Sequence, residues 1–210
     1  MKKHFNLVYI LFISQLIVGC IGHVNTEKLV LPVYGEKKAV GSEVRDTIYH
    51  TVGPFLFKNQ FGENVTEQTI KNKIYVADFF FATCQSICPK MSTQLVNVQK
   101  AFAKDDSVLI LSHTVNPMHD TVEVLKGYAD SYGAIKNKWH FLTGSKKEIY
   151  DMARYSYLVN ALEDGSAEGF LHSELFVLID AKKRIRGFYD GTDNVAVNKL
   201  IADIKLLKTE

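Results

Sequence analysis

Cysteine is scarce in this chain of 210 residues, with three copies at positions 20, 84 and 88. No internal repeat or low-complexity run is present, which excludes repeat architectures. No long basic run is present either, so nucleic acid is not an expected partner. The remaining composition, with 47% hydrophobic and 23% charged residues, is typical of one globular domain with a sizeable core.

The amino terminus has the pattern of a targeting segment. Two lysines precede an apolar stretch at residues 7–18, which has signal-peptide length and is too short for a comfortable membrane span. The stretch ends in "IVGC", and a small residue before a cysteine at this place resembles the lipobox of bacterial lipoproteins. We therefore expect a signal peptide at residues 1–19 and lipidation of Cys20. An ordinary signal peptide, or an uncleaved anchor with a chance cysteine, is the alternative.

Cleavage of this segment would change the net charge of the chain, and its presence indicates the compartment of the mature protein. Residues 1–19 hold two lysines and no acid, so the mature chain would keep 23 of the 25 basic residues against 23 acidic ones. With no net charge, attachment to the membrane would come from lipid rather than from a basic surface. We expect the protein outside the cytoplasm, on the periplasmic side of a bacterial membrane, where thiols can oxidise.

Residues 20–46 show little periodicity and are interpreted as a tether and extended arm, ahead of a domain at residues 47–210. Apolar runs at 74–82, 107–115 and 139–144 predict three buried strands, and helical periodicity follows each of them. A short hairpin that turns at Gly62 precedes this alternation. Two strands at 174–180 and 184–191 with a short turn between them follow it, ahead of a final helix.

This order predicts an α/β protein of the thioredoxin-like type. Its central sheet should be mixed but mostly parallel and flanked by helices, with an N-terminal hairpin extension and a late antiparallel hairpin. Local signals also predict helix starts. Pro89 fits a first helical turn, Asp120 or Thr121 can cap the next helix, and Ser145 with Glu148 forms a capping-box pattern.

Cys84 and Cys88 lie between a buried strand and a helix start, which is where α/β sheets carry out chemistry. The positive end of the helix stabilises an anion, so at least one thiol should have a lowered pKa. If both residues are helical, their Cα atoms lie about 6 Å apart, and if Cys84 lies just before the helix, the loop sets the distance instead. In both cases the pair can form a disulfide or share one ion. Two thiolates favour Cu(I), Zn(II) or iron–sulfur centres, and a histidine is the usual third ligand. A static disulfide is the less favoured alternative, because a bridge across four residues removes little unfolded-state entropy.

Four segments carry a family resemblance. "TCQSICPKM" resembles the C-x-x-x-C-P motif of the Sco (SenC) family, copper-binding thioredoxin-like proteins that assist cytochrome c oxidase assembly. "LSHTVNPMHDT" resembles the family's strand followed by D-P-x-x-D-T, and "LHSELFVLID" resembles the strand entered by its ligand histidine. "RGFYDGTD" is similar to a segment of bacterial members, and the similarity runs from about Tyr49 to Leu207.

The resemblance implies that Cys84, Cys88 and His172 are copper ligands. In the family the reduced cysteines hold Cu(I), whereas both sulfurs and the imidazole bind Cu(II). The implied function is that of a membrane-anchored metallochaperone, which delivers copper to the dinuclear site of cytochrome c oxidase subunit II or reduces the cysteines of that site. We expect a monomer, in which the glycine-containing "EDGSAEG" run lets the following loop bring His172 in when Cu(II) is present.

The chain departs from the family pattern at three positions. The aspartate of the D-P-x-x-D-T run is Asn116, the arginine usual in that run is His119, and a carboxylate often seen before the ligand histidine is Leu171. These changes put in doubt any acidic or partner contact assigned to those places, and they leave the three ligands intact.

Asp78 interrupts the first apolar strand, six residues before Cys84. A buried charge is costly, so this carboxyl needs a partner or a proton. Thioredoxins place an aspartate at the same spacing, where it exchanges protons with the cysteine pair, so Asp78 is a candidate proton acceptor. An aspartate that faces a lysine or a solvated edge is the alternative.

Other soft or nitrogen ligands are weaker candidates. His113, His119 and His140 are placed at strand ends or loops. Met91 fits the apolar stripe of its helix, and Met118 is a minor candidate for transient copper handling from an expected loop. The alternative function is an extracytoplasmic thiol–disulfide oxidoreductase that reduces client cysteines, which leaves open whether the protein is an enzyme. A peroxiredoxin-like peroxidase is disfavoured because the expected proline and threonine pattern around its cysteine is missing.

Overall fold

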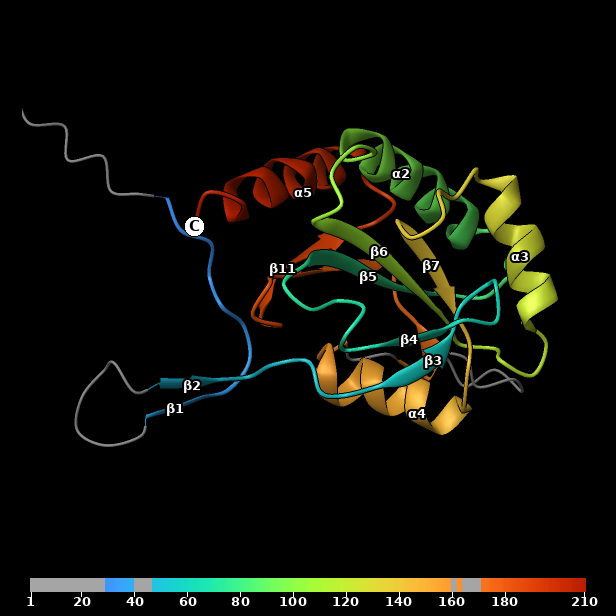
Figure 1. Ribbon diagram of the computed structural model, residues 1–210, viewed down its shortest axis with the longest axis horizontal. Helices are drawn as coiled ribbons and strands as arrows, with labels where there is room; N and C mark the ends of the chain where they lie inside the picture. The colour runs from blue at the N-terminus through green and yellow to red at the C-terminus, as the bar shows by residue number, and fades with distance from the viewer. Residues whose placement is uncertain (1–28, 40–46, 160–161, 164–170) are drawn as a thin grey trace, which may run out of the picture.

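The computed structural model describes residues 29–39, 47–159, 162–163 and 171–210. Its central sheet has five strands in the order β11-β10-β5-β6-β7 (Figure 1). β5, β6 and β7 run parallel, whereas β10 is antiparallel to both β5 and β11, so the predicted mixed sheet with a late antiparallel hairpin is confirmed. The strands are β5 (Ile74–Phe80), β6 (Val108–Thr114), β7 (Trp139–Leu142), β10 (Leu175–Ile179) and β11 (Ile185–Asp190).

Helices cover both faces of the sheet. Every residue of β5 and β6 is buried, as apolar runs in parallel strands require. One face packs against α2 (Ile87–Ala101), α3 (Val122–Ser131) and α5 (Asn194–Leu207). The other packs against α4 (Lys146–Asp151), its π-helical continuation η2 (Met152–Ser156) and a hairpin (Figure 1). Because side chains alternate along a strand, Val76 faces the α2 layer and Ala77 faces the α4 layer.

In the described ranges, three pairs of short antiparallel strands lie outside the central sheet. The predicted hairpin is formed by β3 (Leu56–Lys58) and β4 (Asn64–Thr66), and Gly62 adopts a positive φ of 74° in its turn. β1 (Lys37–Ala39) pairs with β2 (Thr47–Tyr49), and β8 (Leu162–Glu163) pairs with β9 (Leu171–His172).

The helix starts agree with most of the local signals. α2 begins at Ile87, so Pro89 occupies its first turn, and Thr121 rather than Asp120 caps α3 by accepting the Val124 N–H. The capping-box prediction is wrong at α4, because Ser145 precedes the helix but its side chain makes no capping hydrogen bond. Ser145 is exposed, so water can satisfy the first N–H groups of this helix instead.

Within the described part of the arm, residues 29–34 are attached at one end of the sheet. Leu31 is buried in the α2-side core, and the Tyr34 N–H donates to the Ile185 carbonyl over 2.9 Å. Ile185 pairs with Ile179, which pairs with Tyr75 near the start of β5. The arm therefore meets the sheet at the end where β5 begins, opposite the end from which the chain continues to Cys84.

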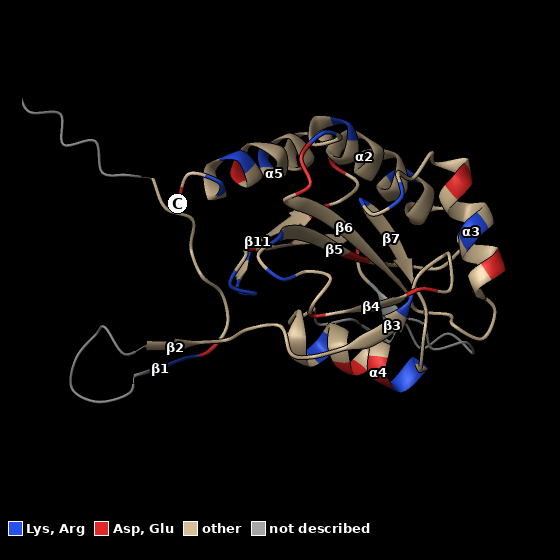
Figure 2. Ribbon diagram, viewed as in Figure 1, with Lys and Arg blue, Asp and Glu red and all other residues tan. Residues whose placement is uncertain are grey.

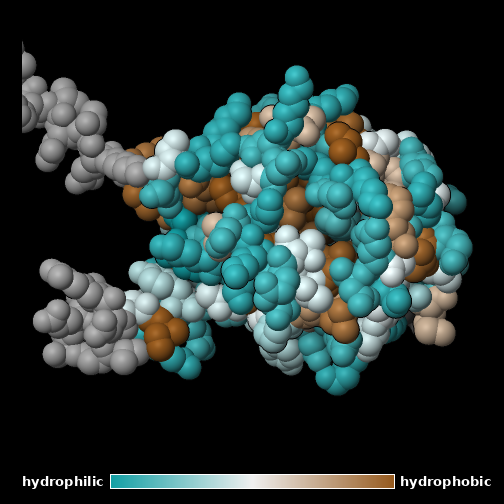
Figure 3. All heavy atoms as spheres, in the orientation of Figure 1, coloured by the Kyte–Doolittle hydropathy of each residue, from teal (hydrophilic) through white to brown (hydrophobic). Residues whose placement is uncertain are grey.

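The surface carries charges of both signs. Acidic and basic residues are mixed over α3 and α4 (Figure 2), and the face seen in Figure 3 is mostly hydrophilic with separate hydrophobic patches. Within the part of the chain that the structure describes, no helix combines the length and the apolar character needed to cross a membrane.

Candidate metal centre

The two cysteines lie together where the loop after β5 enters α2. Cys84 is 9% exposed and Cys88 is 2% exposed, and both are free thiols that join the core beneath α2. The Cys84 N–H donates to the Phe81 carbonyl over 3.2 Å, which turns the loop back towards the helix. The two side chains hydrogen-bond to each other, and the Ser86 hydroxyl lies 3.7 Å from the Cys84 sulfur.

The two thiols have opposite acid–base character. Burial raises the pKa of Cys84, but hydrogen bonds from the backbone N–H groups of Cys88 and Ser86 outweigh it and leave the pKa lowered. Burial raises the pKa of Cys88 well above its usual range, and the adjacent sulfur and the charge of Asp78 add to the increase. The expectation that at least one thiol has a lowered pKa is confirmed at Cys84, and Cys88 beside it has a raised pKa.

Asp78 lies inside the molecule on the same side of the sheet as the thiols. It is 1% exposed, so it does not face a solvated edge. The Ser112 hydroxyl donates to its Oδ1 over 2.5 Å, and the Trp139 Nε1–H donates to that hydroxyl over 2.9 Å. Burial raises the pKa of Asp78 to about 7, although the Ser112 hydrogen bond works in the opposite direction. Its effect on the pKa of Cys88 places Asp78 within electrostatic range of the pair.

Asp120 joins the cysteine loop to the end of β6. This carboxylate is 0% exposed; its Oδ2 accepts the Ala82 N–H over 3.0 Å and the Thr114 hydroxyl, and its Oδ1 lies 2.9 Å from His119 Nδ1. Sequence reasoning considered Asp120 only as a helix cap. Its place in the D-P-x-x-D-T-like run, directly after a buried strand, was the available signal.

For the third predicted ligand, His172, the structure describes the position of the backbone alone. His172 is the second residue of β9, where it pairs with Leu162, and β9 contacts β5, the strand that leads to the cysteines. The side chain of His172 lies outside the described part of the structure, and so does Cys20. Among the described residues, no group of three or more His, Cys, Asp or Glu side chains gathers as a metal cluster. The structure thus brings two of the predicted ligands together.

The remaining candidate ligands, which are histidines and methionines, differ in how deeply they are buried. His113 and His140 lie near strand ends, as expected, because His113 is the next-to-last residue of β6 and His140 is the second residue of β7, and both are buried. Burial lowers the pKa of His113 to about 3, and its Nε2 lies 3.3 Å from the Tyr157 hydroxyl. Met91 is part of the core, whereas Met118 is 87% exposed.

Comparison with known proteins identifies relatives across most of the chain. A family model described as SCO1/SenC matches residues 45–208. The SCO1 protein homolog of Bacillus subtilis is 32% identical over 171 residues, which cover 80% of this chain and 89% of the relative.

Solved structures show the same fold. A SCO1/SenC family lipoprotein from Bacillus anthracis superposes with a TM-score of 0.67 at 29% identity, covering 76% of this chain and 95% of the other. BsSco, described as a member of the Sco family of cytochrome c oxidase assembly proteins with a disulfide switch, gives 0.66 at 32% identity, with 76% and 94% covered. ScoI of Arabidopsis thaliana with copper bound gives 0.61 at 27% identity, with 76% and 99% covered.

The fold is therefore thioredoxin-like, and the relatives include a lipoprotein, an oxidase assembly protein and a copper-bound protein. With a family match over residues 45–208 and the paired thiols at the start of α2, this chain belongs to the SCO1/SenC family.

Proposed function

We propose that this protein is a copper metallochaperone that carries copper on Cys84 and Cys88, with His172 as an additional ligand for Cu(II). The observation that carries the proposal is the contact between the two cysteine side chains at the start of α2. Thiolates are soft ligands that select Cu(I), and two adjacent sulfurs bind one ion from the same side. The position of β9 beside β5 supports a role for His172, because it brings that part of the backbone towards the strand before Cys84.

The acid–base arrangement makes Cys84 the first thiol of the pair to lose its proton. The pKa of Cys84 is lowered, whereas the pKa of Cys88 is raised well above its usual range, so Cys88 keeps its proton at neutral pH. Copper binding requires that proton to leave, because the metal ligand is the thiolate. In this proposal Asp78 accepts it, since its pKa of about 7 suits proton transfer near neutral pH and its charge reaches Cys88.

The proposed location is the outer side of a bacterial membrane, with lipid attached to Cys20. The "IVGC" sequence supports this, and so does the presence of a lipoprotein among the structural relatives. The client that we propose is the dinuclear copper site of cytochrome c oxidase subunit II. The description of a relative as an oxidase assembly protein supports this choice of client.

Copper loading of the full-length chain tests the proposal. The reduced protein in detergent should bind one Cu(II) with an intense sulfur-to-copper absorption. His172→Ala should lose most of that absorption and at least about tenfold in Cu(II) affinity, since changing even the outer partners of a metal ligand costs that much. His172→Ala should retain Cu(I), whereas a Cys84→Ser, Cys88→Ser double variant should retain neither ion.

His50→Gln is the matched control, because the His50 ring contacts the Ser156 carbonyl, over 2.8 Å, at the β2–η2 side of the molecule. This variant should behave as the unchanged protein. An unaltered Cu(II) spectrum in His172→Ala would show that His172 is not a copper ligand. If the unchanged protein exchanges disulfides rapidly with client thiols and retains no copper, its function is that of an oxidoreductase and not of a metallochaperone.

A further inference from the structure

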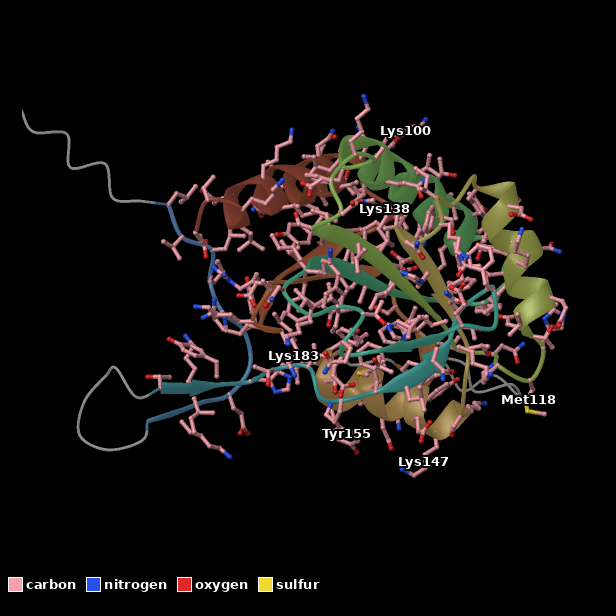
Figure 4. The ribbon with its side chains drawn as sticks, in the orientation of Figure 1. Lys100, Met118, Lys138, Lys147, Tyr155 and Lys183 are labelled. Atoms are coloured by element: carbon pink, nitrogen blue, oxygen red, sulfur yellow. The ribbon has the colours of Figure 1, made fainter. Side chains whose placement is uncertain are left out.

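The turn after β6 carries a thioether and an imidazole at consecutive exposed positions, Met118 and His119. The His119 and Asp120 N–H groups both donate to the Asn116 carbonyl, over 3.1 and 2.9 Å, which fixes this turn. Met118 is 87% exposed, and 51% of the His119 side chain is exposed. Figure 4 shows the Met118 side chain projecting from the ribbon into solvent. A fully exposed methionine gains nothing from burial, so packing does not account for it.

The His119 ring is oriented as metal-ligating imidazoles are. Its Nδ1 lies 2.9 Å from Oδ1 of the buried Asp120 carboxylate. In the neutral ring, donation of the Nδ1 proton to this carboxylate leaves the lone pair on Nε2. A carboxylate that holds the other ring nitrogen fixes the tautomer and raises the basicity of the ligating nitrogen in protein metal sites.

The same carboxylate connects this turn to the cysteine loop. Asp120 accepts the Ala82 N–H over 3.0 Å, and Ala82 is two residues before Cys84. The described part of the chain contains no other exposed methionine, since Met91 and Met152 are 1% and 5% exposed. Asp120 therefore links the turn that holds Met118 and His119 to the loop that leads to Cys84.

We propose that Met118 and His119 form a second, exposed Cu(I) site, at which the protein receives Cu(I) before passing it to Cys84 and Cys88. The proposal rests on the metallochaperone function proposed above. A thioether and an imidazole suit Cu(I) and bind it more weakly than two thiolates do, so transfer runs towards the cysteines. In the transfer, the bonds from copper to sulfur and nitrogen of the turn break, and two copper–thiolate bonds form. Each of the two thiols that is still protonated gives its proton to a base, and copper stays Cu(I), so no electron moves.

Methionine-methyl NMR of the full-length protein tests this site directly. The chain has four methionines, so few signals need assignment. Oxidation of Cys84 and Cys88 to a disulfide removes the competing thiolates, and Ag(I) serves as a redox-silent substitute for Cu(I). We expect a saturable shift of the Met118 methyl signal and none of Met91 or Met152. Met118→Leu and His119→Gln should each weaken Ag(I) binding by at least about tenfold.

A second measurement follows transfer in the reduced protein. Loading from a Cu(I) complex should be slower in both variants, with the same final copper content as the unchanged chain. Met152→Leu, a buried change, should alter neither Ag(I) binding nor the loading rate. An unmoved Met118 signal, an Ag(I) affinity that is unchanged in His119→Gln, or equal loading rates would overturn the second site while leaving copper binding at the cysteines intact. Failure of the reduced unchanged protein to hold any copper would instead overturn the metallochaperone function, and the transfer step with it.

Discussion

At the scale of single residues, two buried carboxyl groups near the thiols are accommodated in different ways. Asp120 accepts hydrogen bonds from the Ala82 backbone and the Thr114 hydroxyl and also contacts a histidine ring, which compensates the loss of water. Asp78 receives one hydrogen bond, from Ser112, and its pKa rises to about 7. Asp120 is therefore suited to hold two loops together, whereas Asp78 is suited to exchange a proton.

The raised pKa of Asp78 predicts a pH-dependent stability. The folded protein keeps a proton up to about pH 7 that the unfolded chain releases near its ordinary pKa of 3.8. The contribution of Asp78 to the free energy of unfolding therefore falls as pH rises through this window, by about 4 kcal/mol, and is constant above it. Asp78→Asn lacks this group, so the stability difference between the two proteins should change by that amount.

Urea unfolding of both copper-free, reduced proteins from pH 4 to pH 8 measures this difference. Comparing the two proteins removes the titrations that they share. A difference that stays constant with pH would show that Asp78 is not protonated in the folded protein at pH 5 to 6.

At the scale of elements, the start of α2 makes the thiol pair chemically unequal. The first N–H groups of a helix have no partner within the helix. Here the Cys88 N–H, together with that of Ser86, bonds to the Cys84 sulfur, while Cys88 itself lies deeper against the sheet. The difference in pKa between the two thiols therefore depends on α2 keeping its position against β5 and β6. Its buried stripe of Met91, Leu95 and Val98 provides that attachment.

Leu95→Ala tests how strongly α2 is held. Leu95 is 0% exposed, and truncation of such a leucine leaves a cavity, so the free energy of unfolding should fall by about 2–5 kcal/mol. Asn97→Ala, on the exposed face of the same helix, should change it by less than about 0.5 kcal/mol. Chemical denaturation measures both variants, and equal effects at the two positions would contradict the packing described for α2.

At the scale of the whole molecule, the arm and the thiol pair occupy opposite ends of the sheet. Arg186 holds the arm: its guanidinium donates to the carbonyls of Leu31 and Pro32 over 2.7 and 2.9 Å, and pairs with Asp180 and Glu210. Cys20 precedes residue 29 by nine residues, a reach of at most about 30 Å. A lipid at Cys20 would therefore keep the arm end of the domain near the membrane and leave the copper-binding end facing outwards, towards a projecting client.

Arg186→Ala should release this attachment. Arg186 is 2% exposed, and removing it leaves buried Asp180 and partly buried Glu210 short of a partner, so stability should fall by about 3–5 kcal/mol. Hydrogen exchange at the Leu31 and Tyr34 amides should accelerate, because their acceptors belong to Glu210 and Ile185.

Arg184→Ala is the matched control for this clamp. Its side chain is 21% exposed and also pairs with Asp180, which keeps Arg186 as a partner in this variant. Stability should fall by only about 1 kcal/mol, with the exchange of the arm amides unchanged. Equal exchange in Arg186→Ala and the unchanged protein would show that the arm is held by other contacts.

The sequence by itself determined the elements and the cysteine pair. Apolar runs at β5 and β6 and the periodic stripe of α2 are local patterns, and the four-residue spacing of Cys84 and Cys88 predicted that the pair can share one ion, whether the helix or the loop before it sets their distance. The tertiary structure alone decided what surrounds them. Burial and hydrogen bonds from distant segments set the pKa values of Asp78, Cys84 and Cys88. Asp120 became a link between two loops rather than a cap, and the arm was placed opposite the thiols. These properties depend on contacts between residues far apart in the chain, which local patterns do not encode.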